Sequence, residues 1–256
     1  MDERSEQVVE RVIVSMQENL GEHLTVTDMA RCAMFSKFHF TRVFRRVTGV
    51  SPGRFLSAMR IQEAKRLLVS TTSTVADISY LVGYNSPGTF SSRFKESVGV
   101  SPIVYRQLRG HAPVLTRRHG SDFERPVATL RGTMRILGEG QRGLTFVGLF
   151  RDPIPQGSPV SCSVLSAPGS FLLEKVPEGT WHLLAQSVAP GAEATVTGSI
   201  GPDDAPFVGS FGPVVVRQDV PVIDVDLDLR PARALDPPVL LALLDVRTAA
   251  LQERTG

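Results

Sequence analysis

The chain has 256 residues, of which 42% are hydrophobic, so it is long enough for two domains with ordinary buried cores. Two cysteines, Cys32 and Cys162, are too few for a disulfide framework or a cysteine-based zinc site. Because the opening residues are charged and no run of about 18 apolar residues occurs, we expect a cytoplasmic protein without membrane contact.

The charge is divided unevenly along the chain. Residues 1–120 hold 17 Lys and Arg against 10 Asp and Glu, a net charge of +7. Residues 121–256 hold 11 against 16, a net charge of −5. Between Arg31 and Arg66, nine basic residues face a single acidic residue, Glu63. Such a field attracts a polyanion, although a merely solvated basic surface explains it equally well.

Up to about Leu108 the apolar residues recur at helical spacing between short Gly, Ser and Pro breaks, which predicts an all-α domain over residues 1–109. Within it, we expect Thr27 to cap a short helix that contains DMARCA. Ser36 is expected to cap a second helix, from Lys37 to about Val47. Because a very short turn separates the two helices, they predict a helix-turn-helix unit.

The second of these helices has two distinct faces. One is an apolar stripe that must face the core, formed by Phe40, Val43, Phe44 and Val47. The opposite stripe is exposed and carries arginines, which can pair with guanine in the major groove, and a phenylalanine, which can touch the thymine methyl. We expect Arg42 to be the main base reader, with Phe38, His39 and Thr41 as secondary contacts and Lys37, Arg45 and Arg46 at phosphates. The alternative is an ordinary helical hairpin with a charged outer face and Phe38 packed on a neighbour.

The same pattern recurs about fifty residues later in the chain. Thr74 is expected to cap a helix that Gly83 breaks, and Ser86 with Pro87 to open another through about Val98. Residues 97–105, SVGVSPIVY, match residues 47–55, VTGVSPGRF, and Phe90 and Phe94 repeat the roles of Phe40 and Phe44.

Between the copies, FLSAMRIQEAKRLLVS predicts one uninterrupted helix, roughly 22 Å long, that acts as a rigid spacer. Two recognition helices on one monomer can then enter successive major-groove segments, which lie about 34 Å apart. A single chain is therefore expected to read an asymmetric site.

Three stretches, DMARCAMFSKFHFTRVFRRVTGVSPGRFL, RIQEAKRLL and VADISYLVGYNSPGTFSSRFKESVGVSPIVYR, together resemble the DNA-binding domain of AraC/XylS-type transcriptional regulators. The resemblance implies seven helices, with both recognition helices in the major groove of double-stranded DNA. By position, it implies base contacts from Lys37, Phe38, Thr41 and Arg42 in the first unit and from Thr89, Ser91 and Ser92 in the second. Phosphate contacts are expected from Ser36, Arg45, Arg46, Ser86, Arg93 and Lys95.

The chain departs from that family in two respects. Many members carry arginine where this chain has Ser92, with the arginine displaced to Arg93, and the second recognition helix opens with Pro87 and Gly88 instead of larger polar residues. We therefore expect the second unit to read bases weakly. The family also generally places its DNA-binding half last, whereas here it comes first.

The remaining residues predict a linker over 110–126 and a C-terminal all-β domain over 127–256, which makes the fold class multidomain α+β. About seven short strands, rich in Val, Leu, Ile, Thr and Phe, alternate with Gly, Pro and Asp clusters up to about Arg230. After Pro238, the run VLLALLDVRTAALQER predicts a closing helix.

The clearest strand is Val222 to Arg230, in which apolar residues alternate with aspartates. The apolar set is Val225, Leu227 and Leu229, and the acidic set is Asp224, Asp226 and Asp228. The aspartates suggest a calcium site, but their period-two spacing without a converging loop favours a solvated outer face.

Residues 148–188 resemble a transthyretin-like or carboxypeptidase-regulatory type of β-sandwich, in which a Pro-x-Gly-x-aromatic turn leads into a strand. Pro177, Gly179 and Trp181 form that turn here. Trp181 is either a ligand-stacking platform or a half-buried core anchor, and we favour the anchor. Since the domain has one histidine, His182, and one lysine, Lys175, we expect no enzymatic activity, no cofactor and no metal.

Two functions remain open. In the first, the chain is a sequence-specific DNA-binding transcriptional regulator whose C-terminal domain senses a small-molecule effector or forms a homodimer, with RNA polymerase as a further partner. In the second, the helical half is an interaction module and the sandwich binds carbohydrate or protein. Gel shifts at two salt concentrations distinguish the two, because a regulator retains selected sequences when salt weakens nonspecific binding.

Overall fold

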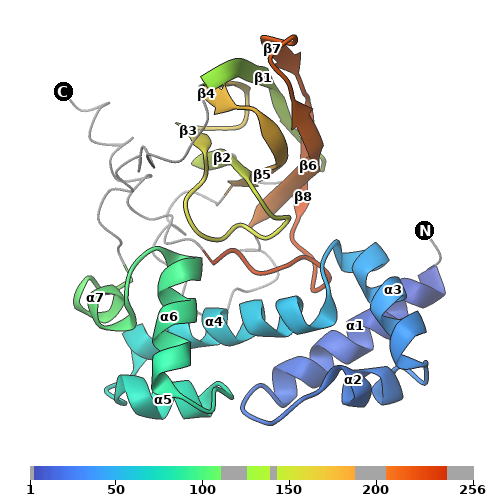
Figure 1. Ribbon diagram of the computed structural model, residues 1–256, viewed down its shortest axis with the longest axis vertical. Helices are drawn as coiled ribbons and strands as arrows, with labels where there is room; N and C mark the ends of the chain where they lie inside the picture. Colours follow the sequence, from blue (N-terminus) through green and yellow to red (C-terminus); the bar gives the residue numbers. More distant parts are fainter. Residues whose placement is uncertain (1–2, 111–125, 139–142, 188–205, 241–256) are drawn as a thin grey trace. The chain divides into compact units, whose positions relative to one another are not determined.

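The computed structural model describes residues 3–110, 126–138, 143–187 and 206–240, and these form two compact units. The first, which we call the helical unit, contains Met1–Gly110 together with Arg233–Leu240. The second, which we call the β unit, contains His111–Ala232 and Leu241–Gly256. Figure 1 shows that the described helices all lie in the first unit and the described strands all lie in the second.

The helical unit has seven α-helices in its described residues, as the family resemblance implied. They are α1 (Glu3–Glu18), α2 (Val26–Cys32), α3 (Lys37–Thr48), α4 (Pro52–Ser70), α5 (Val75–Leu81), α6 (Pro87–Val98) and α7 (Pro102–Gln107). The pairs α2–α3 and α5–α6 are the two predicted helix-turn-helix units, and α4 is the spacer between them (Figure 1). The spacer helix begins at Pro52, a residue that suits the first turn of a helix.

Capping boxes begin the first helix of each unit. Thr74 caps α5 as predicted, but α2 is capped by Thr25, and the expectation for Thr27 is wrong. The Thr25 hydroxyl accepts the Asp28 N–H at 3.3 Å, and the Asp28 carboxylate accepts the Thr25 N–H at 3.0 Å. Thr27 has Ala30 at the corresponding position, which offers no such acceptor. The Thr25 hydroxyl also donates to the Asp28 carboxylate at 2.5 Å, and this bond, together with the bond from the Thr25 N–H, holds the pKa of Asp28 below its ordinary value.

Each helix-turn-helix unit is built on an equivalent trio of buried aromatic rings. In the first unit, Phe40, Phe44 and Phe55 pack edge to face, with neighbouring ring centroids 5.5 Å apart. In the second unit the corresponding centroids are 5.7 and 5.5 Å apart, and the rings are those of Phe90, Phe94 and Tyr105. The internal repeat seen in the sequence is therefore a repeat of the core.

Within the helical unit, Arg60 of α4 joins the two helix-turn-helix units to each other. Its Nε donates to the Leu20 carbonyl at 3.0 Å and its Nη2 to the Glu22 carbonyl at 2.6 Å, both in the loop between α1 and α2. Gly83, in the turn of the second unit, lies so close that an added Cβ would be 2.6 Å from Arg60 Nη2. Burial lowers the pKa of Arg60, although a guanidinium stays charged. The two helix-turn-helix units are thus packed against each other as well as connected through α4.

The β unit has one sheet of eight strands in its described residues, one more than the number predicted. They are β1 (Pro126–Ile136), β2 (Thr145–Phe150), β3 (Ser161–Leu165), β4 (Ser170–Pro177), β5 (Gly179–Ser187), β6 (Phe207–Val216), β7 (Val222–Asp224) and β8 (Leu227–Pro231). The order is β3-β2-β5-β6-β8-β1-β4, with β7 beside β1. Neighbouring strands are antiparallel, except that β1 runs parallel to β7 and β8.

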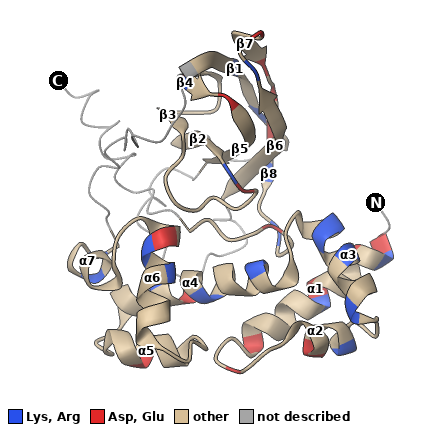
Figure 2. Ribbon diagram, in the orientation of Figure 1, with Lys and Arg blue, Asp and Glu red and all other residues tan. Residues whose placement is uncertain are grey.

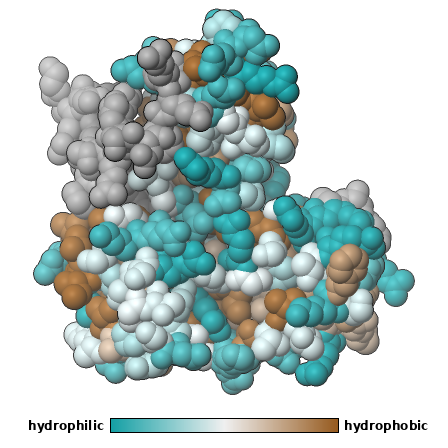
Figure 3. Space-filling model, viewed as in Figure 1, coloured by the Kyte–Doolittle hydropathy of each residue, from teal (hydrophilic) through white to brown (hydrophobic). Residues whose placement is uncertain are grey.

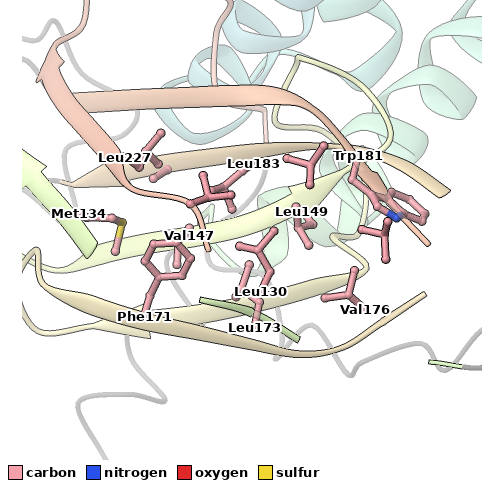
Figure 4. Packing of buried hydrophobic residues seen from close by; sticks show 14 of the residues in the cluster. Leu130, Met134, Val147, Leu149, Phe171, Leu173, Val176, Trp181, Leu183 and Leu227 are labelled. Carbon is pink, nitrogen blue, oxygen red and sulfur yellow. The ribbon is translucent and has the colours of Figure 1, made fainter. Parts of the chain in front are cut away.

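The core of the β unit is formed by side chains from several of its strands. Figure 4 shows side chains of β1, β2, β4 and β5 pointing toward one another, among them Leu130, Leu149, Leu173 and Leu183. At one end of this cluster Trp181 is 4% exposed, and its indole N–H donates to the Pro177 carbonyl at 3.0 Å. Trp181 is therefore a core anchor, as favoured, and it is more deeply buried than the half-buried position predicted.

The alternating segment after Pro221 is two short strands instead of one. Its alternation is confirmed, because the three apolar residues are buried and the three aspartates are exposed. The break comes at Asp226, whose carboxylate accepts the Thr133 N–H at 2.9 Å and so replaces a main-chain carbonyl in the ladder. Asp224 and Asp228 pair with arginines of β1, at 2.7 Å from Arg131 and 3.1 Å from Arg135. Nowhere in the described ranges do three His, Cys, Asp or Glu side chains gather as metal ligands.

We expect Asp224→Asn to lower the urea midpoint of the β unit only slightly, because its ion pair with Arg131 is exposed on both sides. The change should shrink further in high salt, which screens exposed charges. Urea titrations at low and high salt measure it, with and without calcium chloride. A stabilisation by calcium that the substitution abolishes would restore the calcium-site interpretation.

Two predicted segments lie outside the described residues. One is nearly all of the linker 110–126, and the other is the closing helix from residue 241 onward. Val239 and Leu240, where that helix was expected to begin, are described and are not helical. None of the helices in the described part of the chain combines the length and the apolar composition that a membrane span requires.

Candidate nucleic-acid interface

The recognition helices α3 and α6 begin and end in the same way. The Ser36 hydroxyl accepts the His39 N–H at 3.3 Å, and the Ser86 hydroxyl accepts the Thr89 N–H at 3.4 Å. Each helix ends at a left-handed glycine whose N–H donates to a main-chain carbonyl four residues earlier. Both helices therefore present their outer residues in the same local frame.

The inner face of α3 is buried and its outer face is exposed, as the periodicity predicted. Phe40, Val43 and Phe44 lie in the core, while Val47 is half-buried. On the outer face the Phe38 ring is 80% exposed, and Thr41 is half-buried with its hydroxyl donating to the Lys37 carbonyl at 2.8 Å. The basic side chains on this helix are all exposed: Lys37, Arg42, Arg45 and Arg46.

His39 is placed differently from its neighbours on α3. Its ring is half-buried and packs edge-on against Phe35, with the ring centroids 4.6 Å apart. Its Nδ1 lies 3.4 Å from Nη2 of Arg42, within reach of a hydrogen bond. His39 thus supports the Arg42 guanidinium from within the helix, a role that spacing alone did not reveal.

The exposed face of α6 carries less positive charge than that of α3. Thr89, Ser92 and Lys95 are exposed and Ser91 is half-buried. Arg93 is also exposed, but its guanidinium lies 3.0 Å from the Glu96 carboxylate. Helix α3 holds four basic residues and no acidic one. Figure 2 shows this difference as basic residues along α3 against a mixture of both signs on α6.

Sequence reasoning overlooked Met34, in the turn between α2 and α3. This side chain is 81% exposed and its backbone is left-handed, with φ of 56°. It stands where the second unit has Gly83, so aligning the two copies through their turns would have found it. In Figure 3 the visible side of α3 is mainly hydrophilic, with apolar side chains among the charged ones.

The chain has two tandem helix-turn-helix units, and the recognition helix of the first, α3, is strongly basic. This combination defines a DNA-binding protein of the helix-turn-helix class. The family described as "Helix-turn-helix domain" matches residues 29–108. The transcriptional activator AarP of Providencia stuartii is 33% identical over 99 residues, which are 39% of this chain and 73% of AarP. The TetD protein of transposon Tn10 from Escherichia coli is 32% identical over 100 residues and is covered to 72%. The chain belongs to the AraC family of DNA-binding transcriptional regulators.

Other relatives are longer regulators that the chain matches over about a third of their length. The lactose operon transcription activator of Staphylococcus xylosus is 31% identical over 98 residues, 38% of this chain and 35% of that protein. Among solved structures, the DNA-binding domain of AdpA in complex with a target DNA is 31% identical, with a TM-score of 0.38. The match covers 39% of this chain and 89% of the AdpA chain. The family match at residues 29–108 leaves the β unit outside it.

Proposed function

We propose that α3 supplies most of the sequence-specific contacts of this regulator and that α6 serves mainly to anchor the DNA backbone. The observation that carries this proposal is the contrast between the two exposed faces. Helix α3 presents four basic side chains and contains no acidic residue, and it also carries a ring that is 80% exposed. On α6, the Glu96 carboxylate partly neutralises Arg93. Exposed arginine and an apolar group are the side chains that read guanine and the thymine methyl.

In this proposal Arg42 is the main base reader, and His39 both holds its guanidinium and contacts a base. Lys37, Phe38 and Thr41 complete the base contacts of the first unit, and Thr89, Ser91 and Ser92 supply weaker contacts in the second. The phosphate contacts come from Ser36, Arg45, Arg46, Ser86, Arg93 and Lys95. Such contacts set the register and add salt-dependent affinity without reading the sequence.

One chain then reads two neighbouring segments of the major groove. Helix α4 has 19 residues, about 28 Å at 1.5 Å per residue, and Arg60 ties the loop before α2 to it. Rigid spacing of this kind suits groove segments about 34 Å apart on one face of the duplex. The binding site need not be a palindrome, because the two reading helices of one monomer are not related by symmetry.

For the β unit we propose effector sensing or homodimer formation, with RNA polymerase as a further partner of the DNA-bound protein. Its separate core supports a self-contained role, and the exposed apolar side chains of Phe211 and Val215 on β6 offer a surface for association. Sedimentation over a range of protein concentrations tests the dimer, and DNA titrations with and without candidate metabolites test the sensor.

Selection from random-sequence DNA, followed by gel shifts at two salt concentrations, tests the proposed mode of reading. We expect enrichment of a defined asymmetric site whose preference over random DNA persists when salt weakens all binding. Binding that falls equally for every sequence as salt rises would contradict a sequence-specific reader. That result would favour the remaining possibility, an interaction module joined to a binding domain.

A further inference from the structure

Residues 233–240, which we call the strap, follow the last strand of the β unit but belong to the helical unit. Strand β8 ends at Pro231, and the strap that follows packs in the same compact unit as the helices. In Figure 1 the strap is the red segment that runs along α4. The helical unit is therefore discontinuous in sequence, with the β unit inserted between α7 and the strap.

The strap is attached to two helices of the unit. At its beginning, Nη1 of Arg233 lies 3.4 Å from the Glu6 carboxylate on α1. Near its end, Nζ of Lys65 on α4 donates to the Val239 carbonyl at 3.3 Å. The strap also buries two leucines, Leu235 and Leu240.

The contact with Lys65 is notable for its burial. Lys65 is 1% exposed, and a buried ammonium is costly unless polar groups satisfy it. The Val239 carbonyl is one such group, and it is supplied by a residue 174 positions away in the chain. The strap thus supplies a hydrogen-bond acceptor to the buried ammonium group of α4.

Between these attachments the strap borders an open groove of about 640 Å³, which it shares with α1 and α4. The residues that line the groove include Ile13, Phe55, Met59, Ala234 and Pro238. Since the groove is open along one side of the strap, the strap is held by its two polar attachments and by its two buried leucines.

The strap follows the β unit without an intervening linker, because Ala232 belongs to the β unit and Arg233 to the strap. The Ala232 N–H donates to the Pro206 carbonyl at 2.8 Å within the β unit, and the next residue, Arg233, pairs with Glu6. A displacement of the chain at the end of β8 must therefore pull on the strap directly.

We propose that the strap couples the β unit to DNA reading: when it leaves α1 and α4, the two recognition helices lose their fixed spacing. Helix α1 packs against α3, and α4 connects the two helix-turn-helix units. Loosening α1 or α4 therefore disturbs the relative placement of the two recognition helices. The readout on DNA rests on the proposed function, whereas the attachment of the strap does not.

Hydrogen exchange measured by mass spectrometry on the full-length chain tests the attachment. Two variants weaken the attachment, Leu240→Ser in the strap and the milder Lys65→Met in α4, and we call them the strap variants. We expect both to speed exchange of the α1 and α4 amides at least about tenfold through local opening. The control is Val222→Ser in β7, an exposed apolar residue, which should leave both helices unchanged. Unchanged exchange in α1 and α4 for both strap variants overturns the proposal.

DNA titration of the same variants tests the coupling. We expect both strap variants to bind the selected DNA site at least about tenfold more weakly than the parent, while Val222→Ser binds normally. Faster exchange in α1 and α4 with unchanged DNA affinity shows a structural clamp only and also overturns the proposal. If the parent itself selects no DNA sequence, the proposed function has failed, and the exchange data still decide the attachment.

Discussion

Arg42→Ala is expected to weaken binding to the selected DNA site by about 10- to 100-fold, the loss typical of one bidentate contact to a base. The guanidinium is exposed on the outer face of α3 and is supported by His39, so its removal leaves the fold intact. Specificity should relax at a single base pair, which a panel of DNA sites with one substitution each will reveal.

Two arginines provide matched comparisons for Arg42. Arg46→Ala should weaken binding to all sequences alike and reduce the salt dependence by about one charge, as expected for a phosphate contact. Arg93→Ala should have a smaller effect, because Glu96 already neutralises part of its charge. If Arg93→Ala abolished specificity while Arg42→Ala barely changed it, α6 would be the main reader and the proposed ranking would be wrong.

Gly83→Ala is expected to lower the free energy of unfolding of the helical unit by about 2–4 kcal/mol. The residue has a left-handed φ of 82°, which alanine adopts only with strain. An added Cβ would also lie 2.5 Å from the Leu20 carbonyl and 2.6 Å from Nη2 of Arg60, the contact that joins the two helix-turn-helix units. Urea denaturation followed by circular dichroism measures the loss.

Two other glycines separate strain from crowding. Gly49 has φ of 79° but nothing within 4 Å of an added Cβ, so Gly49→Ala should cost only about 1 kcal/mol of strain. Gly53 lies in α4 with equally open surroundings and no left-handed backbone, so alanine there should stabilise by about 0.5–1 kcal/mol. Equal losses for Gly83→Ala and Gly49→Ala would argue against tight packing between the two units.

The helical unit was predictable because its signals are local and occur twice. Apolar residues at helical spacing, a serine before each recognition helix and the repeated Gly-x-Ser-Pro motif all act within a few residues of each other. Thr25 was missed because a capping box depends on its partner, Asp28, and a threonine at position 27 competes for the same role. The β unit was predicted as a class, but the break at Asp226 arises from a hydrogen bond to distant Thr133.

The exposed face of α3 followed from periodicity, but its finer arrangement did not. The position of His39 depends on a ring contact with Phe35 across the turn, and the exposure of Met34 depends on the left-handed backbone there. Arg60 and Lys65 looked like ordinary members of a basic run. Their bonds to main-chain carbonyls of other segments exist only in the folded chain, so no local pattern announces them.

The discontinuous helical unit has a consequence for the order in which the protein is made. Domains generally fold as they emerge from the ribosome, N-terminal first. Here the helices up to Gly110 emerge early, but the segment that completes their unit is translated only after the β unit. The helical unit of a newly made chain is therefore complete only after Leu240 has been translated.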